Sequence, residues 1–252
     1  MLEVKNLSIA FKTSSGLRSA VQDMSFTIQP GEILGLVGES GSGKTITSLG
    51  VIGLLPPNAV VTGGEVLVDG VDLLKLSPLE LQKLRGRHVA MIFQDPMASL
   101  DPIFTCGAQI TEAILLHEEI SEAAARDKAR ALLEKVRISD PQRTMRSYPH
   151  ELSGGQCQRV MIAMAVACKP HIIIADEPTT ALDVTVQKQV LDLLAGLNEE
   201  VGAAILLITH DLGVIYEAAD RVVVMYAGEK VEEATTRDLF ANPKSDYARA
   251  LI

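Results

Sequence analysis

The eight residues that begin at position 38, of sequence GESGSGKT, have the types and spacing needed to bind the phosphates of a nucleotide. Glycines in this pattern let successive backbone N–H groups turn toward phosphate oxygens. The lysine reaches the terminal phosphates, and the hydroxyl that follows it binds Mg²⁺. The sequence therefore predicts a phosphate loop formed by Gly38, Glu39, Ser40, Gly41, Ser42, Gly43, Lys44 and Thr45.

The segments on either side favour this loop over its alternative, a glycine-rich turn with a solvated lysine. The apolar run at residues 33–37 predicts a buried strand that ends where the loop begins. Residues from Ile46 onward predict a helix that starts where the loop ends. Such a helix adds the positive end of its dipole to the phosphate site.

Three further apolar runs have the same form, because each is followed directly by polar side chains. They span residues 90–93, 172–175 and 204–208 and lead into Gln94, into Asp176 and Glu177, and into Thr209 and His210. Ligands of a parallel α/β sheet collect outside the carboxyl ends of its strands. If the four runs are neighbouring strands, these polar side chains meet around the phosphates.

The polar residues of this group suit the chemistry of phosphoryl transfer. Asp176 can hold Mg²⁺, a hard cation that prefers carboxylate oxygen, and Glu177 can polarise the attacking water. His210 is expected to contact the γ-phosphate. Each assignment has an alternative. The acidic pair could cap a helix before Pro178, Gln94 could be only solvated, and His210 could be a capping histidine or one whose hydrogen bonds are satisfied within the fold.

A second anion site is predicted at residues 152–156, of sequence LSGGQ. Its serine is a suitable N-cap for a buried helix that contains residues 160–167, and its glycines leave N–H groups open at the helix start. One nucleotide needs only one such group of backbone N–H donors, and the phosphate loop already supplies it. We therefore expect the nucleotide of another chain to be bound by Ser153, Gly154, Gly155 and Gln156, with an ordinary capped helix as the alternative.

The rest of the chain predicts further parts of an α/β protein. Alternating apolar and polar residues in the first thirty positions predict two antiparallel strands, and residues 63–70 predict another strand. Residues 96–149 predict a helical insert, with a helix at 121–136. Residues 221–231 predict a hairpin.

Composition limits the classes of function. The 252 residues include 23 Lys and Arg against 32 Asp and Glu, a net charge of −9, which argues against a nucleic-acid-binding surface as the main feature. Cys106, Cys157 and Cys168 lack any disulfide or metal-binding spacing, which indicates reduced thiols of a cytosolic protein. No apolar stretch approaches about 18 residues, so we expect any membrane role to depend on a partner.

In this order, the motifs resemble those of the ATP-binding cassette (ABC) superfamily, and the resemblance covers essentially the whole chain. Residues 38–45 look like its Walker A loop, Gln94 like its Q-loop, residues 152–156 like its signature motif, residues 172–177 like its Walker B motif, and His210 like its switch histidine. Residues 181–183 look like its D-loop. Phe11 stands where the family often has an aromatic residue against adenine, although a phenylalanine of the core fits nearly as well.

The resemblance implies an α/β fold with a P-loop NTPase core and a mainly parallel sheet. An N-terminal antiparallel β subdomain and a helical subdomain inserted at residues 95–150 would complete a single ATP-binding domain at residues 1–252. The implied cofactors are ATP and Mg²⁺, with the metal near Thr45, Gln94 and Asp176, and catalysis by Glu177, His210 and Gln94. The resemblance also implies a head-to-tail dimer, in which each ATP lies between one subunit's Walker A loop and the other's signature motif.

Two longer segments, residues 93–102 and 176–187, are similar to the subfamily that imports dipeptides, oligopeptides and nickel. This likeness implies an ATPase on the cytoplasmic face of the inner membrane that powers two membrane permease subunits. A second ABC ATPase subunit, distinct or a copy, and an external solute-binding protein would complete the complex. Peptides, nickel, other chelated metals and glutathione are all open as solutes. The alternative functions are a soluble ABC ATPase with a mechanical or regulatory role, and a cassette that binds ATP without hydrolysing it.

Two features depart from this subfamily. Its peptide-type members usually continue well past the equivalent of residues 247–251, so we expect either a trimmed chain or a short member. Cys157 stands where the subfamily usually has an arginine after the signature motif. We expect this change to remove a positive charge close to the nucleotide of the partner.

Overall fold

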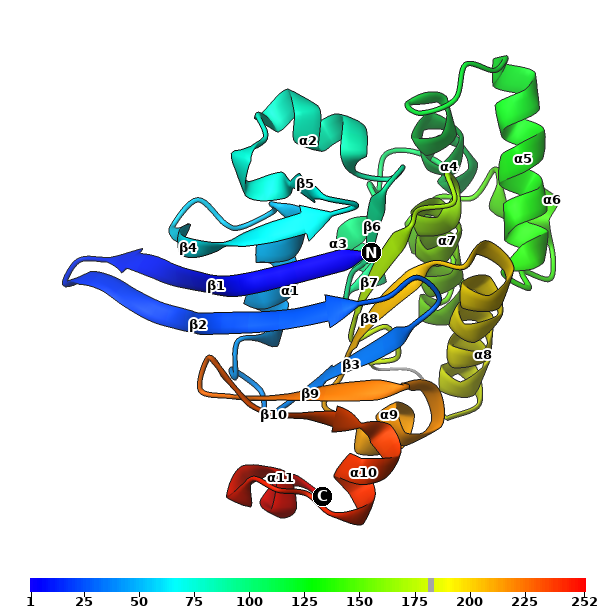
Figure 1. Cartoon of the computed structure of the whole chain (residues 1–252). Coiled ribbons are helices and arrows are strands. Elements are labelled where there is room, and N and C mark those ends of the chain that lie inside the picture. The colour runs from blue at the N-terminus through cyan, green and yellow to red at the C-terminus, as the bar shows by residue number, and fades with distance from the viewer. Residues whose placement is uncertain (181–183) are drawn as a thin grey trace.

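Two β-sheets organise the computed structural model of the protein, which describes residues 1–180 and 184–252 (Figure 1). One sheet is antiparallel, and the other is parallel up to its last strand. This arrangement confirms the predicted α/β fold with an antiparallel sheet at the N-terminus. The predicted D-loop, residues 181–183, lies outside the described residues.

The antiparallel sheet has the strand order β2-β1-β4-β5. Its strands are β1 (Leu2–Thr13), β2 (Gly16–Ile28), β4 (Ala59–Val68) and β5 (Val71–Asp72). Strand β4 begins earlier than residue 63, where it was predicted to start. The reason is that Val60 and Val61 pair with Ala10 and Ile9 of β1.

The second sheet has the order β10-β9-β3-β8-β7-β6, which places the four predicted apolar strands side by side. Its strands are β3 (Ile33–Val37), β6 (Val89–Ile92), β7 (Ile172–Asp176), β8 (Ala204–Ile208), β9 (Arg221–Tyr226) and β10 (Glu229–Thr235). Strands β9 and β10 form the predicted hairpin. Because β3, β8, β7 and β6 are parallel, their carboxyl ends lie at one edge of the sheet.

Both faces of the parallel sheet are covered, which explains why continuous apolar runs form its strands. Leu34 and Leu36 pack on the face toward the antiparallel sheet and α1. Ile173 and Ala175 pack on the opposite face, toward α7, α8 and α9. These helices are α1 (Lys44–Ile52), α7 (Gly154–Val166), α8 (Val184–Val201) and α9 (Leu212–Ala218).

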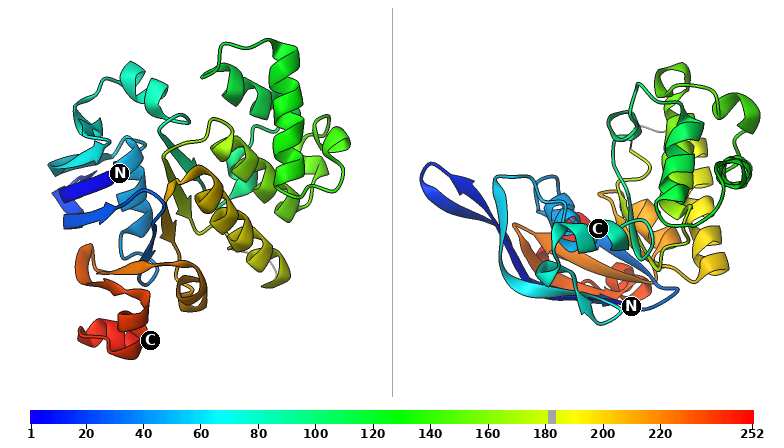
Figure 2. Two further views of the ribbon diagram at one scale, coloured as in Figure 1. Left: turned by 45° about the vertical axis from the view of Figure 1, so that its right-hand side comes forward. Right: turned by 90° about the horizontal axis from the view of Figure 1, so that it is seen from above.

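Between β6 and α7 the chain forms a group of helices beside the parallel sheet, visible in both views of Figure 2. The group contains α3 (Pro96–Ser99), α4 (Cys106–Leu115), α5 (Glu122–Lys135), α6 (Pro141–Thr144) and the 3₁₀ helix η2 (Pro149–Glu151). Helix α5 confirms the helix predicted at 121–136, and Ser121 caps it by accepting a hydrogen bond from the N–H of Ala124. Ile110, Ile114 and Leu133 of this group share a hydrophobic core with α7.

Among the described residues, four short helices outside the sheets and the helical group were not predicted. They are η1 (Leu73–Lys75), α2 (Pro78–Leu84), α10 (Thr236–Ala241) and α11 (Asp246–Leu251). The signal for α2 was present in the sequence, because Ser77 and Glu80 form a capping box at its start. Within the described ranges, each helix is too short or too polar to cross a membrane.

Candidate nucleotide-binding site

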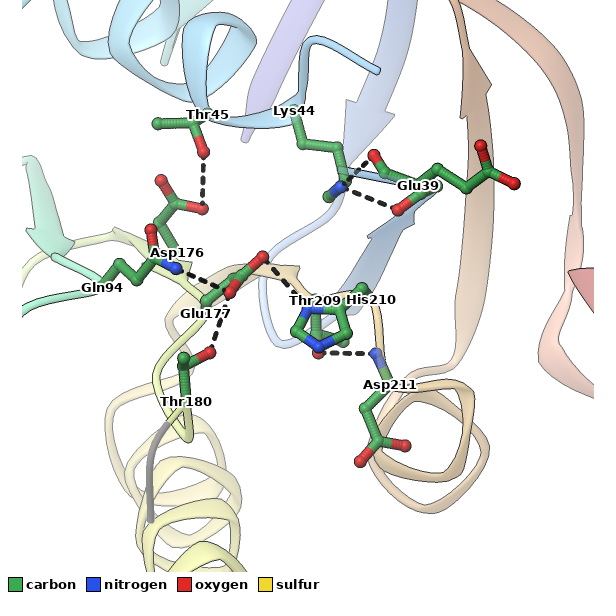
Figure 3. Close-up of polar contacts among 11 residues, drawn as sticks. Glu39, Lys44, Thr45, Gln94, Asp176, Glu177, Thr180, Thr209, His210 and Asp211 are labelled. Carbon is green, nitrogen blue, oxygen red and sulfur yellow. Dashed lines mark hydrogen bonds and ion pairs between the residues drawn. The ribbon is translucent and has the colours of Figure 1, made fainter. Parts of the chain in front are cut away.

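A cleft of about 680 Å³ lies at the carboxyl edge of the parallel sheet. Predicted site residues form much of its lining: Phe11, Ser40, Gly41, Gly43, Lys44, Thr45, Gln94 and Glu177. Asp176 ends β7 and contacts Thr45, and His210 follows β8 and contacts Glu177 (Figure 3). The structure thus brings the phosphate loop together with the polar residues that follow β6, β7 and β8.

Three glycines give the loop its backbone path. Gly38, Gly41 and Gly43 have φ angles of 155°, 81° and 105°, values that residues with a Cβ rarely adopt. A Cβ on Gly38 would stand 2.1 Å from the carbonyl oxygen of Met225 in β9. The loop therefore requires glycine at position 38 for space as well as for conformation.

The side chain of Lys44 is buried beneath the loop. Its Nζ donates hydrogen bonds to the carbonyl oxygens of Gly38 and Glu39, at 2.7 and 2.9 Å (Figure 3). Burial lowers the pKa of this ammonium group, and the nearby Glu177 and Asp176 carboxylates oppose that shift. These contacts hold a positive charge beside the backbone that would cradle the phosphates.

Two further features of the loop suit an anion. The N-cap of helix α1 is Gly43, which has no side chain to cap it, so in the described part of the chain no capping side chain competes for the first N–H groups of the helix. The Ser42 hydroxyl is buried and has no hydrogen-bond partner among the described residues. A phosphate oxygen would give these donors an acceptor, so the residues present fit a bound nucleotide.

Thr45 and Asp176 form the candidate metal position. Thr45 Oγ1 donates to Asp176 Oδ1 at 3.4 Å, and Asp176 is 2% exposed. Burial raises the pKa of Asp176 to about 6, a shift that the Thr45 hydrogen bond and Lys44 oppose and the Glu177 charge reinforces. A hydroxyl and a carboxylate are ligands that Mg²⁺ accepts, and a divalent cation would offset the cost of this buried charge.

Glu177 is held by side chains from three other positions in the chain (Figure 3). Its Oε2 accepts hydrogen bonds from Gln94 Nε2 and Thr180 Oγ1, both at 2.8 Å. Its Oε1 lies 3.2 Å from His210 Nδ1. The three residues predicted for catalysis, Glu177, His210 and Gln94, are therefore direct neighbours.

The backbone leaves the extended conformation of β7 at Glu177. Its φ angle is +47°, in the left-handed region that is uncommon for residues other than glycine. Burial raises the pKa of the carboxyl group, but hydrogen bonds from Thr180 and His210 and the charges of His210 and Lys44 lower it overall. Glu177 is thus kept in the ionised form that a general base needs.

The loop after β8 positions His210 at the rim of the cleft. Thr209 Oγ1 accepts a hydrogen bond from the N–H of Asp211 at 3.0 Å. Asp211 in turn caps α9 by accepting from the N–H groups of Gly213 and Val214. These contacts fix the backbone on the C-terminal side of His210, whose side chain is 60% exposed and open to a ligand.

Phe11 lies on the β1 side of the cleft. It is half-buried and belongs to neither hydrophobic core, so the alternative of a core phenylalanine is wrong. Arg18 of β2 is its cross-strand partner and lines the same cleft. Arg18 was not predicted as a site residue, because only the register between β1 and β2 places it there.

The signature segment stands apart from this cleft, whose described lining contains none of its residues. Ser153 caps α7: its Oγ accepts from the N–H of Gln156 at 3.4 Å, and Gln156 Oε1 accepts from the N–H of Ser153 at 2.9 Å. Gly154 is exposed, and no atom of the described residues lies within 4 Å of the place where its Cβ would be. The N-cap is confirmed, and the use of Ser153, Gly154, Gly155 and Gln156 as an anion site stays a prediction.

The expectation for Cys157 was wrong. Its side chain is fully buried, and its Sγ donates a hydrogen bond to the carbonyl oxygen of Pro149 at 3.3 Å. Burial raises the pKa of this thiol. The side chain at position 157 therefore faces the interior between α7 and η2, rather than a nucleotide outside the subunit.

Two contacts to the phosphate loop come from the C-terminal part of the chain. The hydroxyl of Tyr247 accepts a hydrogen bond from the N–H of Glu39 at 3.0 Å, across 208 positions of sequence. The N–H of Gly228 donates to the carbonyl oxygen of Ser42 at 2.9 Å. Sequence reasoning missed both contacts, because no local signal at these positions marks them.

The sequence of the chain is similar to those of ATP-binding proteins of transporters. A sequence model described as ABC transporter matches residues 21–180. The whole chain is 50% identical to a probable peptide ABC transporter ATP-binding protein of Sinorhizobium fredii, of which it covers 76%. It is also 49% identical to the oligopeptide transport ATP-binding protein OppD of Bacillus subtilis, covering 71% of that protein. The dipeptide transport ATP-binding protein DppD of Bacillus subtilis is 47% identical, with 76% covered.

Solved structures of similar fold include dimeric cassettes. The ATP-binding cassette MJ0796, in a dimeric post-hydrolysis state bound to ADP and Pi, has a TM-score of 0.84 and 33% sequence identity. The match covers 94% of this chain and 99% of that one. CbiO1 of Clostridium perfringens, part of the ABC transporter complex CbiONQ, has a TM-score of 0.79 and 25% identity, over 96% of this chain and 90% of that one.

Proposed function

The chain belongs to the ABC transporter family, and we propose that it is the ATP-hydrolysing subunit of an importer that takes up peptides. The observation that carries the proposal is that Lys44 and Glu177 line one cleft beside the glycine-containing phosphate loop. Asp176 joins them through its contact with Thr45, which lines the same cleft. The names of the similar proteins, which are peptide, oligopeptide and dipeptide transport proteins, support the choice of solute.

ATP would bind with its phosphates in the loop at residues 38–45 and its base against the ring of Phe11. Backbone N–H groups and Lys44 would bind the terminal phosphates. Contacts from Gly228 and Tyr247 already hold the loop from outside. Binding therefore requires little rearrangement of the backbone.

Thr45, Asp176 and Gln94 would hold Mg²⁺, which neutralises charge on the phosphates when it is bound. Glu177 would accept a proton from the water whose oxygen attacks the γ-phosphorus. The bond between the β–γ bridging oxygen and that phosphorus then breaks, leaving ADP and phosphate. His210, which contacts the same carboxylate, would contact the γ-phosphate and so link its position to that of the base.

The signature residues of one subunit would complete the site of a second ABC subunit, either a distinct chain or a copy. In support, the exposed start of α7 at Ser153 and Gly154 lies outside the subunit's own cleft. A similar cassette of 33% identity forms a dimer in its ADP- and Pi-bound structure. Closure of such a dimer would exclude water from the phosphates and strengthen the electrostatic contacts around them.

The helical segment at residues 95–150 would act as a subdomain that docks on two membrane permease subunits. Its surface carries exposed apolar side chains, including Ile103 at 71% and Phe104 at 51%. These residues follow Gln94 closely in the chain, and Gln94 bonds directly to Glu177. A movement of the docked segment would therefore change the position of the Glu177 carboxylate through the side chain of Gln94. The subunit would work at the cytoplasmic face of the membrane, with an external solute-binding protein delivering the peptide.

Purification of the tagged chain from native membranes tests this function. We expect two membrane subunits and a second ABC subunit to co-purify. In proteoliposomes, the complex should hydrolyse ATP faster when a peptide-loaded binding protein is present. Recovery of ribosomes or DNA-maintenance factors in place of membrane subunits would favour the alternative, a soluble ABC ATPase.

A further inference from the structure

Two histidines and an aspartate meet at the edge of the parallel sheet opposite the nucleotide cleft. His88 directly precedes β6, His171 directly precedes β7, and Asp69 lies in the turn between β4 and β5. One ligand atom from each of these side chains lies within 4.8 Å of the other two. Strand β7 separates His171 from Asp176 by about 16 Å, at 3.3 Å per residue. The cluster is therefore distinct from the nucleotide site.

Strand pairing fixes the two histidines side by side. Val89 and Ile172 are partners in the parallel ladder of β6 and β7, strands that lie next to each other in Figure 1. The N–H of Ile172 donates to the carbonyl oxygen of His88 at 3.0 Å. Residues at matching positions on neighbouring strands direct their side chains to the same face. The two imidazole rings accordingly lie edge to face, with their centroids 5.1 Å apart.

Asp69, in the turn between two strands of the antiparallel sheet, contacts His171 of this histidine pair. Its Oδ2 lies 2.7 Å from His171 Nδ1, and its Oδ1 lies 2.7 Å from the amino nitrogen of Met1. These two hydrogen bonds lower the pKa of the carboxyl group, so it is ionised at neutral pH. Burial, together with the charges of His171 and Arg87, lowers the pKa of His88 and favours the neutral imidazole that binds metals.

We propose that His88, His171 and Asp69 bind a divalent transition-metal ion of the Zn²⁺ class. Two imidazole nitrogens and one carboxylate oxygen form a donor set that suits Zn²⁺, Co²⁺ or Ni²⁺, whereas Mg²⁺ and Ca²⁺ prefer oxygen ligands. Asp69 and His171 are exposed, which leaves a coordination position open to water.

The distances require a small adjustment of side chains on a fixed backbone. Two ligands of a tetrahedral zinc ion, each about 2.0–2.2 Å from the metal, lie about 3.3 Å apart. The distance between His171 Nδ1 and Asp69 Oδ2 would lengthen from 2.7 Å by about 0.6 Å. Two ligand atoms at the upper limit of 4.8 Å would approach each other by about 1.5 Å.

A bound ion would connect the two sheets, because Asp69 follows β4 and the histidines precede β6 and β7. The unfolded chain does not bring these three residues together. Binding should therefore raise the unfolding temperature as metal is added. This effect is separate from the nucleotide site and does not depend on the proposed transport function.

Titration calorimetry of the full chain with ZnCl₂, without nucleotide, tests the proposal. We expect one equivalent to bind, and we expect His88→Ala and His171→Ala each to weaken binding by at least about 10-fold. His150→Ala is the matched control, since this exposed histidine lies in the helical segment at residues 95–150. His210→Ala should also retain Zn²⁺ binding. That result would show that the ion is not bound in the nucleotide cleft.

Visible absorption of bound Co²⁺ gives a second readout, which should disappear in the same two variants. Asp69→Asn keeps the size of the side chain and should weaken binding even if a histidine variant folds poorly. The absence of saturable Zn²⁺ binding would overturn the proposal. So would binding that survives substitution of both His88 and His171, or binding that is lost in His210→Ala.

Discussion

Replacing Asp176 by asparagine is expected to make the nucleotide-free protein more stable. The carboxylate is 2% exposed, and burial raises its pKa from 3.8 to about 6. Asparagine keeps the size of the side chain and the oxygen that Thr45 contacts, but it has no charge to bury. The substitution removes a cost to folding that accompanies the metal ligand.

The size of the gain follows from the pKa. The difference between about 6 and 3.8 is about 2 units, which at 1.36 kcal/mol per unit gives up to about 3 kcal/mol in the free energy of unfolding. For a chain of this length, such a change corresponds to a rise of roughly 6–12 °C in Tm.

The gain in the free energy of unfolding from Asp176→Asn grows as the pH rises. The pKa of Asp176 is higher in the folded protein than in the unfolded chain, so between about pH 4 and pH 6 the folded state binds more protons. The contribution of Asp176 to the stability of the parent protein therefore falls as pH rises through this range. Below about pH 4 the carboxyl group is protonated in both states, and the advantage of asparagine vanishes. Above about pH 6 the advantage is complete.

Thermal unfolding in EDTA, at about pH 4 and about pH 7.5, measures this difference. Glu177→Gln is a control of opposite sign: its pKa is lowered overall in the folded protein, so its charge stabilises the fold at neutral pH. An Asp176→Asn protein no more stable than the parent at neutral pH would refute the reasoning. A gain of equal size at both pH values would refute it as well.

Three further substitutions test single contacts. Lys44→Ala removes the charge at the loop and should weaken ATP binding at least about 10-fold in a fluorescence titration; unchanged affinity would count against the phosphate-loop assignment. Gly38→Ala places a Cβ about 2.1 Å from the carbonyl oxygen of Met225, so thermal unfolding should show a loss of at least about 1 kcal/mol. A melting temperature equal to that of the parent would show that the loop tolerates the side chain. Tyr247→Phe removes the acceptor of the Glu39 N–H, worth about 1 kcal/mol, and should raise the KM for ATP several-fold with little change in kcat. A parental KM would mean that this contact does not position the loop.

Much of the candidate site could be predicted because its residues stand at the ends of strands. Gln94, Asp176 and His210 each follow an apolar run, and parallel pairing of those runs brings their ends together. The phosphate loop is equally local, since its conformation depends on the positions of its own glycines. Ser153 was recognised as a cap because serine is a favoured N-cap residue and a predicted buried helix follows it, and the structure adds Gln156 as its capping partner.

The remaining contacts depend on pairing between distant segments, which spacing alone does not reveal. Arg18 reaches the cleft through the register of β1 and β2, and Tyr247 reaches Glu39 through the packing of a C-terminal helix. The burial of Cys157 is different, because a signal for it existed. Cys157 stands at helical spacing before Val160 and Met161, and all three are buried.

The central claim is that Glu177 is the base of an ATPase that drives peptide import, and the turnover of the assembled complex tests it most directly. With Glu177→Gln in this chain, ATP binding should match that of the parent, because the phosphate loop and Lys44 are intact. Hydrolysis at this site should fall by at least about 100-fold, and peptide uptake should fall with it. Hydrolysis at this site near the parental rate would contradict the assignment of Glu177.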